Sequence, residues 1–278
     1  MLNAVKCGKF ELKFNRTLVM GILNVTPDSF SDGNLFLDSN EAIKHAKQMV
    51  KDGADIIDIG GESSRPGSEP VSEEEELRRV SQIIKKLKDE IKIPISIDTY
   101  KPKVAEECIK LGASIINDIN GLRNEGMVKV AAKYKVPVVI MHMKGNPKTM
   151  QENPVYKDVV KEIKEFFSQQ TKKARKAGIK DIIIDPGIGF GKTTEHNLKI
   201  LKNLNKFKEL KCPILVGPSR KSFIGNITRL QVNERLEGTI AAISIAIMNG
   251  ANIVRVHDVK ECKRAAMVAD AVRGVLNL

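Results

Sequence analysis

The sequence predicts an α/β protein, a single (β/α)8 TIM barrel over residues 1–278 with a short β extension at its N-terminus. Two observations lead to this fold class: eight short apolar runs recur along the chain, and amphipathic stretches separate them. Near-continuous apolar runs are typical of strands buried on both faces, as in a parallel sheet covered by helices. Eight such units in about 260 residues fit a closed barrel better than an open doubly wound sheet.

The expected strands differ in what precedes them. Four follow a glycine, which can end the preceding helix in the left-handed conformation at little cost, and three begin with a proline. In chain order the strands lie within residues 18–25, 51–61, 94–100, 110–120, 137–143, 176–187, 213–219 and 248–259. The segment KFELKFNR (9–16) precedes them and predicts a small β structure of its own.

The stretches between the strands have helical periodicity. In NEAIKHAKQMVKDG (40–53) and EEEELRRVSQIIKKLKDE (73–90), apolar residues recur at i, i+3 or i+4, and i+7. The residues SEEEE (72–76) place a serine and carboxylates where a helix N-terminus favours them. These features predict one helix after each strand.

Composition and charge narrow the class of protein. The net charge of +12 reflects 46 Lys and Arg against 34 Asp and Glu, and the lysines lie on helical stretches such as 84–92 and 172–180, which indicates solvated helix faces. Aromatic residues make up 4% of the chain and tryptophan is absent, so stacking platforms for single-stranded nucleic acid are scarce. The chain begins without the apolar stretch of a secretion signal, and no run is long enough for a membrane helix. Its four cysteines are far apart and form no CxxC motif, so we expect reduced thiols in a cytoplasmic protein. From the composition and the apolar runs together, we expect the protein to bind neither membrane nor nucleic acid.

Polar residues follow every expected strand. Enzymes with this fold carry their chemistry at the C-terminal ends of the strands, so these residues are expected to meet at one mouth of the barrel. They are Asn24, Asp58 with Glu62, Asp98, Asn117 with Asp118, His142, Asp185, Ser219 with Lys221, and Arg255 with His257.

Two kinds of ligand chemistry are expected at this mouth. Asp98, Asn117 and Asp185 could pair with a flat heterocycle that presents N–H and amino donors, although Asp98 could instead cap a helix and Asp185 could belong to a turn. Positive charge nearby fits a phosphate or carboxylate, and the loop SSRPGS (63–68) could hold phosphate through hydroxyls and backbone N–H groups. Asn24 could place an amide oxygen on Mg²⁺.

Other motifs are weaker. PGIGFGKT (186–193) ends like a P-loop but has Pro186 in place of the first glycine. The histidines lack zinc-site spacing. Lys221 follows Arg220 on a loop, which argues against a Schiff-base lysine with a depressed pKa. In NVTPDSFSDG (24–33), Phe30 belongs either to an ordinary surface loop or to a mobile loop that receives a ligand.

Seven segments together resemble the dihydropteroate synthase family. In chain order they are GILNVTPDSFSDG, DIGGESSRPGS, ISIDT, INDING, IDPGIGFGK, GPSRKSFIG and RVHD. They run from about Val19 to Asp258 and fall at the predicted strand ends. The resemblance implies a pterin-binding barrel of folate biosynthesis that joins p-aminobenzoate to (7,8-dihydropterin-6-yl)methyl diphosphate. The products are 7,8-dihydropteroate and pyrophosphate.

The resemblance also implies a role for individual residues. The pterin would be bound by Asp98, Asn117, Ile119, Met141, Asp185, Phe190, Gly217 and Lys221. The diphosphate would be bound by Asn24 with Mg²⁺, Ser64, Arg65, Arg255 and His257. The p-aminobenzoate site, where sulfonamides bind in this family, would contain Phe30, Pro66, Ser219 and Lys221. Among these, Asp98, Asp185, Lys221, Arg255 and His257 are expected to be catalytic.

This chain departs from the family pattern at two positions, with Ser64 where threonine is usual and Asn34 where a second glycine is common. Neither change puts the expected activity in doubt.

The resemblance further implies loss of diphosphate ahead of amine attack, closure of the loops that carry Phe30 and Arg65 over bound diphosphate, and a homodimer. Residues 239–248 could belong to a dimer interface or to a buried barrel helix. Three other functions remain alternatives: a methyltetrahydrofolate:corrinoid methyltransferase, a pterin-binding module without catalysis, and a basic nucleic-acid-binding protein. The segments NVTPDSFSDG and GPSRKS favour the synthase over the methyltransferase.

Overall fold

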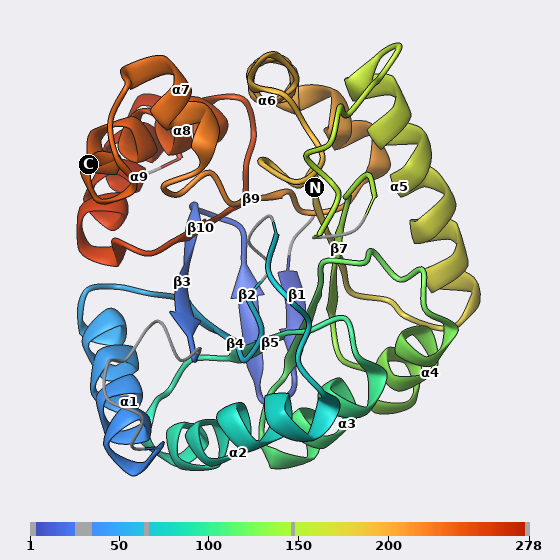
Figure 1. The fold of residues 1–278 in the computed structure, drawn as a ribbon, viewed down its shortest axis with the longest axis vertical. Coiled ribbons are helices and arrows are strands. Elements are labelled where there is room, and N and C mark those ends of the chain that lie inside the picture. The colour runs from blue at the N-terminus through green and yellow to red at the C-terminus, as the bar shows by residue number, and fades with distance from the viewer. Residues whose placement is uncertain (1–3, 26–34, 64–66, 146–147, 276–278) are drawn as a thin grey trace.

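Eight parallel strands form the centre of the molecule, and helices surround them (Figure 1). The computed structural model describes residues 4–25, 35–63, 67–145 and 148–275. In chain order the barrel strands are β3 (Leu18–Asn24), β4 (Ile56–Gly60), β5 (Ile95–Asp98), β6 (Ile115–Asp118), β7 (Val138–Met141), β8 (Ile182–Asp185), β9 (Leu215–Val216) and β10 (Ile253–Val256). All eight lie within the segments predicted from the sequence.

The strand order closes a barrel. Neighbouring strands follow the order β8-β7-β6-β5-β4-β3-β10-β9, and every pairing is parallel. The two ends of this series meet through a parallel bridge between Ile184 and Ile214, and Ile184 N–H donates to the Pro213 carbonyl at 2.9 Å. The predicted fold class is therefore confirmed.

The helices agree with the predicted periodicity. They are α1 (Leu35–Lys51), α2 (Glu73–Glu90), α3 (Pro102–Leu111), α4 (Glu125–Tyr134), α5 (Val159–Lys176), α6 (Thr194–Lys202), α7 (Ser222–Thr228), α8 (Leu236–Met248) and α9 (Val259–Val272), with 3-10 turns η2 (Leu204–Leu210) and η3 (Val232–Glu234). The Ser72 hydroxyl accepts from Glu75 N–H at 3.2 Å and caps α2, as expected.

The N-terminal extension is an antiparallel hairpin of β1 (Ala4–Cys7) and β2 (Phe10–Lys13), which confirms the predicted β structure. It lies at the centre of the ring of helices in Figure 1. Val5, Cys7 and Leu12 of the hairpin share one apolar cluster with the barrel residues Leu18, Met20, Ile56, Ile115, Val139, Ile183, Leu215 and Ile253. The hairpin therefore covers one end of the barrel interior, and the chemistry is left to the other end.

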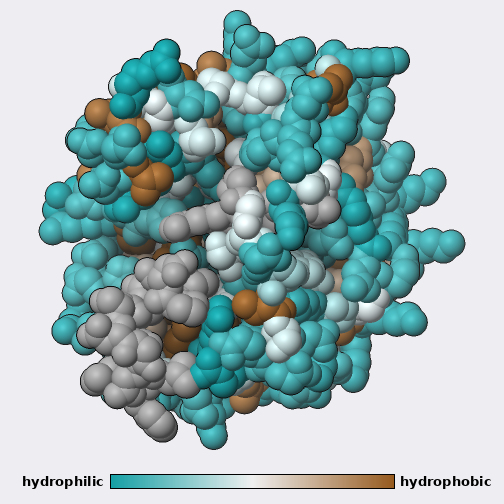
Figure 2. Space-filling model, viewed as in Figure 1, coloured by the Kyte–Doolittle hydropathy of each residue, from teal (hydrophilic) through white to brown (hydrophobic). Residues whose placement is uncertain are grey.

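The surface agrees with the interpretation of the charge. Figure 2 shows a largely hydrophilic face with small, separate apolar groups. Among the described residues, no helix is both long enough and apolar enough to span a membrane. All four cysteines are buried and free.

Candidate active site

An ion-pair network connects three strand ends at the mouth of the barrel. Arg255 on β10 donates from Nε to Asp58 Oδ2 on β4, and from NH2 to Asp98 Oδ2 on β5, each at 2.6 Å. Burial acts to lower the pKa of Arg255, but the two carboxylates outweigh it and raise the pKa, so the guanidinium stays charged. Two predicted site residues, Asp98 and Arg255, are thus in direct contact.

Asp58 also fixes the orientation of Asn117. The Asn117 side chain lies at the end of β6, is 4% exposed, and donates from Nδ2 to Asp58 Oδ2 at 3.0 Å. Because the amide NH₂ is used in this contact, the amide oxygen is the atom that Asn117 turns toward other partners. Asp58 has 0% exposure and is therefore a positioning residue, a role that the sequence did not reveal.

The helix-cap alternative for Asp98 is wrong. Lys101 is the N-cap residue of α3, and the Lys101 N–H bonds to the Thr99 hydroxyl at 3.2 Å. Burial raises the pKa of the Asp98 carboxyl; Asp58 and Glu76 add to this effect, and Arg255 opposes it.

Asp185 has the turn role that the sequence offered as an alternative. Its Oδ1 accepts from Gly187 N–H at 2.8 Å, so it does shape the turn after β8. Burial raises the pKa of Asp185 to about 6, and the Gly187 hydrogen bond and Lys192 oppose that rise. Gly187 has a φ of +68°, and a Cβ there would come within 2.0 Å of the His142 carbonyl oxygen. Only glycine fits this close approach.

An apolar wall lies beside these polar groups. Ile119, Met141 and Phe190, all predicted site residues, form one buried cluster with Met143 and Met150, and Tyr100 packs against it. The Lys221 Nζ lies 4.0 Å from the centroid of the Phe190 ring, a cation–π contact. A polar edge beside an apolar wall suits a flat heterocycle that carries donors on its rim.

His257 and Ser219 form a second polar pair. The Ser219 hydroxyl lies 2.9 Å from His257 Nδ1 and also accepts from His257 N–H at 3.3 Å. Burial, together with Arg255, lowers the pKa of His257 to about 4, so the imidazole is neutral at neutral pH. The contact with Ser219 occupies Nδ1, so Nε2 is the ring nitrogen that His257 turns toward other partners.

Asn24 provides an oxygen near this network. The Cβ that Gly60 lacks would lie 3.9 Å from Asn24 Oδ1 and 3.7 Å from Asp98 Oδ2, so both oxygens lie beside Gly60. No group of three or more His, Cys, Asp or Glu side chains in the described part of the chain could hold a metal by itself. A hard ion held by few protein oxygens and otherwise by phosphate oxygens and water fits this arrangement. Gly217 lies behind Arg255, where a Cβ would make an ordinary 3.6 Å contact.

Some predicted residues are elsewhere. Phe30, Ser64, Arg65 and Pro66 lie outside the described residues. Of the other strand-end residues, Asp118 accepts from the Asn120 and Leu122 N–H groups, both at 2.8 Å, in the turn after β6. His142 packs edge-on against Phe166, with ring centroids 5.1 Å apart, and Glu62 binds Lys101. The partners of these three side chains therefore lie in the loops and helices around the barrel, and none of these contacts joins them to the Asp98–Arg255 network.

Lys192 is a residue near the site that the sequence did not reveal. It is 3% exposed, and its Nζ lies 3.2 Å from His142 Nδ1, 3.1 Å from the His142 carbonyl oxygen and 2.9 Å from the Phe190 carbonyl oxygen. Burial lowers the pKa of Lys192 to about 7, and Asp185 opposes the shift. The lysine of PGIGFGKT therefore points into the protein and joins the ends of β7 and the β8–α6 loop. The unusual glycine spacing of that motif was the only signal.

Comparisons with known proteins show what this chain is similar to. A family model described as pterin binding enzyme matches residues 20–257. A dihydropteroate synthase of Clostridium beijerinckii is 52% identical over 273 residues, which cover 96% of this chain and 99% of that protein.

Two solved structures are similar throughout the fold. Dihydropteroate synthase of Yersinia pestis in a sulfonamide drug complex has a TM-score of 0.93 at 43% identity, with 98% of this chain and 99% of that chain covered. The Xanthomonas albilineans enzyme with 4-aminobenzoic acid has a TM-score of 0.92 at 42% identity, with the same coverage. On this evidence the chain belongs to the pterin-binding enzyme family.

Proposed function

We propose that this protein is a dihydropteroate synthase. It condenses p-aminobenzoate with (7,8-dihydropterin-6-yl)methyl diphosphate and releases pyrophosphate. One observation supports this most directly: the Asp98–Arg255–Asp58–Asn117 network stands beside the apolar wall that contains Phe190, at the mouth of a barrel whose relatives are named for this reaction.

The pterin ring fits between these groups. Asp98 and Asp185 can accept from its N–H and amino groups, and the oriented amide oxygen of Asn117 can accept another. Ile119, Met141 and Phe190 cover a ring face, and Lys221 stands over Phe190. The corrinoid methyltransferases also bind a pterin, but the close relatives of this chain are synthases.

The chain's own residues favour charge separation. As the C–O bond to diphosphate breaks, positive charge develops on the pterin methylene and spreads into the ring, beside the buried carboxyls of Asp98 and Asp185. The aniline nitrogen then forms the C–N bond and loses a proton. Because aniline needs little activation, the site mainly orients it and excludes water.

The leaving diphosphate gathers negative charge. Arg255 remains cationic between two carboxylates, and the neutral His257, in its Nε2–H tautomer, would donate to a leaving oxygen. Asn24 would hold Mg²⁺, which supplies Lewis-acid stabilisation of the leaving oxygens when bound. Ser64 and Arg65 are proposed to complete this subsite.

Phe30, Pro66, Ser219 and Lys221 are proposed to bind p-aminobenzoate, with sulfonamides as competitors for the same place. Support comes from the relatives, since one solved structure holds 4-aminobenzoic acid and another a sulfonamide drug. Phe30→Gly should weaken p-aminobenzoate binding far more than pterin binding, and an equal loss of both would argue against this subsite.

The direct test follows pyrophosphate release from the pterin diphosphate with Mg²⁺, with and without p-aminobenzoate, and detects 7,8-dihydropteroate by mass. Release coupled to product is expected. Tight pterin binding with no release would instead favour the methyltransferase or the non-catalytic module. Loss of release with EDTA and recovery with added Mg²⁺ tests the metal.

A homodimer in the cytoplasm is proposed as the working state. The neighbouring helices α8 and α9 expose Ile245, Met248, Met267, Val268 and Val272, and a second copy of this chain would cover them. The four buried free thiols suit a reducing compartment. Val268→Lys with Ile245→Lys should halve the mass seen by light scattering, whereas Ile227→Lys on α7 should not. A monomeric wild-type protein would contradict the dimer.

A further inference from the structure

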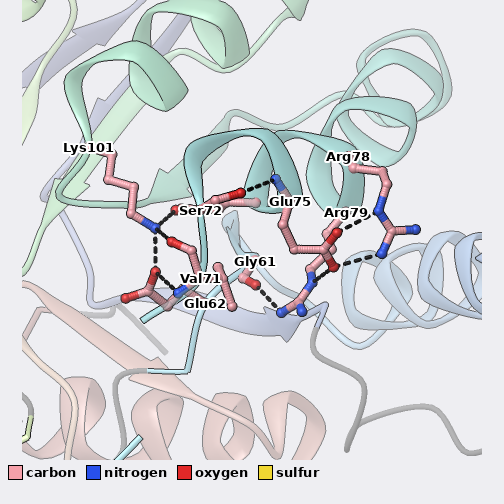
Figure 3. Close-up of polar contacts among 9 residues, drawn as sticks. Gly61, Glu62, Val71, Ser72, Glu75, Arg78, Arg79 and Lys101 are labelled. Atoms are coloured by element: carbon pink, nitrogen blue, oxygen red, sulfur yellow. Dashed lines mark hydrogen bonds and ion pairs between the residues drawn. The ribbon is translucent and has the colours of Figure 1, made fainter. Parts of the chain in front are cut away.

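A buried ammonium lies beside the connection between β4 and α2. Lys101 immediately precedes α3, and its side chain is 11% exposed. The Nζ donates to the Glu62 carboxylate, to the Val71 carbonyl at 2.6 Å and to Glu76 Oε2 at 2.8 Å. An ammonium has three protons, and each finds an acceptor. Figure 3 shows Lys101 pointing toward Glu62 and the backbone at Val71.

The acceptors belong to the two ends of one connection. Glu62 stands two residues after β4, and Val71 stands two residues before α2. Val71 N–H also donates to Glu62 Oε2 at 3.2 Å, so these two residues hold each other as well as Lys101. The entrance to the connection is fixed again by Arg79, which donates to the Gly61 carbonyl at 2.8 Å (Figure 3).

The same cluster reaches the pterin wall. The Tyr100 hydroxyl donates to Glu62 Oε1 at 2.7 Å, and the Tyr100 ring packs against the cluster that contains Met141 and Phe190. Glu62 therefore has one oxygen on the side of the wall and the other on Lys101 and Val71. The connection and the wall share a single carboxylate.

Stability alone does not account for this arrangement. Two carboxylates with side-chain exposures of 10% and 1% surround one ammonium, and burying such a group in place of apolar side chains brings little net stability. What the group does provide is a defined geometry, because each member has several directed partners.

We infer that Lys101 is a positioning residue that holds the two ends of the β4–α2 connection at a fixed spacing and register against the pterin wall. Its effect on the reaction rests on the proposed function, because Ser64, Arg65 and Pro66 belong to this connection in the sequence. Loss of Lys101 should then impair the sites for p-aminobenzoate and diphosphate more than the site for the pterin ring.

The test compares Lys101→Met with Lys103→Met, which removes an exposed lysine in the first turn of α3, the helix that Lys101 precedes. Lys101→Met is expected to raise KM for p-aminobenzoate about tenfold, while 6-hydroxymethyl-7,8-dihydropterin binds within about twofold of wild type. Lys103→Met should match wild type in both. If Lys101→Met does not fold, Glu62→Gln replaces it with the same expectation.

A double-mutant cycle with Arg65→Ala separates positioning from general destabilisation. If Lys101 acts through the connection, most of its effect on KM disappears in the Arg65→Ala background. Additive effects, or equal losses of pterin binding and KM, would overturn the inference. A wild-type protein that makes no dihydropteroate would instead overturn the proposed function, so the two failures are distinguishable.

Discussion

Lys101 and Lys192 are both largely shielded from solvent near the mouth of the barrel, and their surroundings differ. Lys101 donates to two carboxylates and one carbonyl, whereas Lys192 faces two carbonyls and an imidazole nitrogen. Burial acts to lower the pKa of both amines. The carboxylates reverse this effect at Lys101, whose pKa is raised, while the pKa of Lys192 is lowered to about 7.

The difference separates two uses of one side chain. Lys101 is a permanent cation that holds a connection in place, and the cost of its desolvation is offset by ion pairs. The Lys192 amine donates hydrogen bonds to the carbonyls of His142 and Phe190, and burial disfavours its protonated form at neutral pH. The imidazole of His142 does not compete for the proton, because burial, with Lys192 nearby, lowers the pKa of His142 to about 2.

The largest expected effect concerns stability at Lys101. Lys101→Met leaves Glu62 and Glu76 buried without their cation, so the free energy of unfolding at pH 7 should fall by about 3–5 kcal/mol. Adding Glu76→Gln should recover part of this loss. Urea unfolding measures both variants, with Lys103→Met expected to match wild type. If the free energy of unfolding of Lys101→Met equalled that of wild type, the ion pairs of Lys101 would not offset the cost of removing these charges from water.

The second effect appears in the pH dependence of stability. Between pH 7 and 10.5 the Lys192 amine binds a proton in the unfolded chain but is mostly deprotonated in the folded chain. The free energy of unfolding therefore rises with pH in this range. The unfolding free energy of wild type relative to Lys192→Met should therefore increase by roughly 2 kcal/mol from pH 7 to pH 9.

Lys101 should behave in the opposite way. Its folded pKa lies above the unfolded value of 10.5, so its contribution is fully present below that pH and is lost only as the pH rises through the folded pKa. The difference between wild type and Lys101→Met should stay flat from pH 7 to 9. Parallel curves for both lysines would remove the contrast between them.

The smallest expected effect concerns the ligand. Lys192→Met frees the Phe190 carbonyl from its donor, so 6-hydroxymethyl-7,8-dihydropterin should bind about tenfold more weakly, or about 1.4 kcal/mol. Calorimetry compares this variant with Lys199→Met, an exposed lysine on α6. Unchanged pterin binding in Lys192→Met would show that the β8–α6 loop does not depend on this contact.

Much of the fold was predictable because its signals are local. Strand and helix periods are set by residues a few positions apart, and Gly53, Gly112, Gly178 and Gly250 all have positive φ where helices end. The expectation that polar residues at the C-terminal ends of the strands meet at one mouth also located Asp98, Asn117, Asp185 and Arg255, since the ends of parallel strands lie at one edge of a barrel.

The partners within the site were not predictable in the same way. Arg255 and Asp58 are separated by 197 positions, and nothing near either residue indicates that they pair or that Asp58 orients Asn117. Asp118 and His142 follow the strand-end pattern equally well, yet they contact the loops, because each directly follows a residue that faces the site, Asn117 or Met141, and consecutive side chains point to opposite faces.

The sequence by itself determined the barrel, the positions of its strands and helices, and the polar edge at which a pterin is expected. Tertiary structure decided which charges meet and which protons they keep. Lys101 and Lys192 are both lysines near helix N-termini in a basic chain, and no local pattern distinguishes them. Their protonation differs because packing places carboxylates around one and neutral acceptors around the other, and in a buried site these neighbours outweigh the solvent.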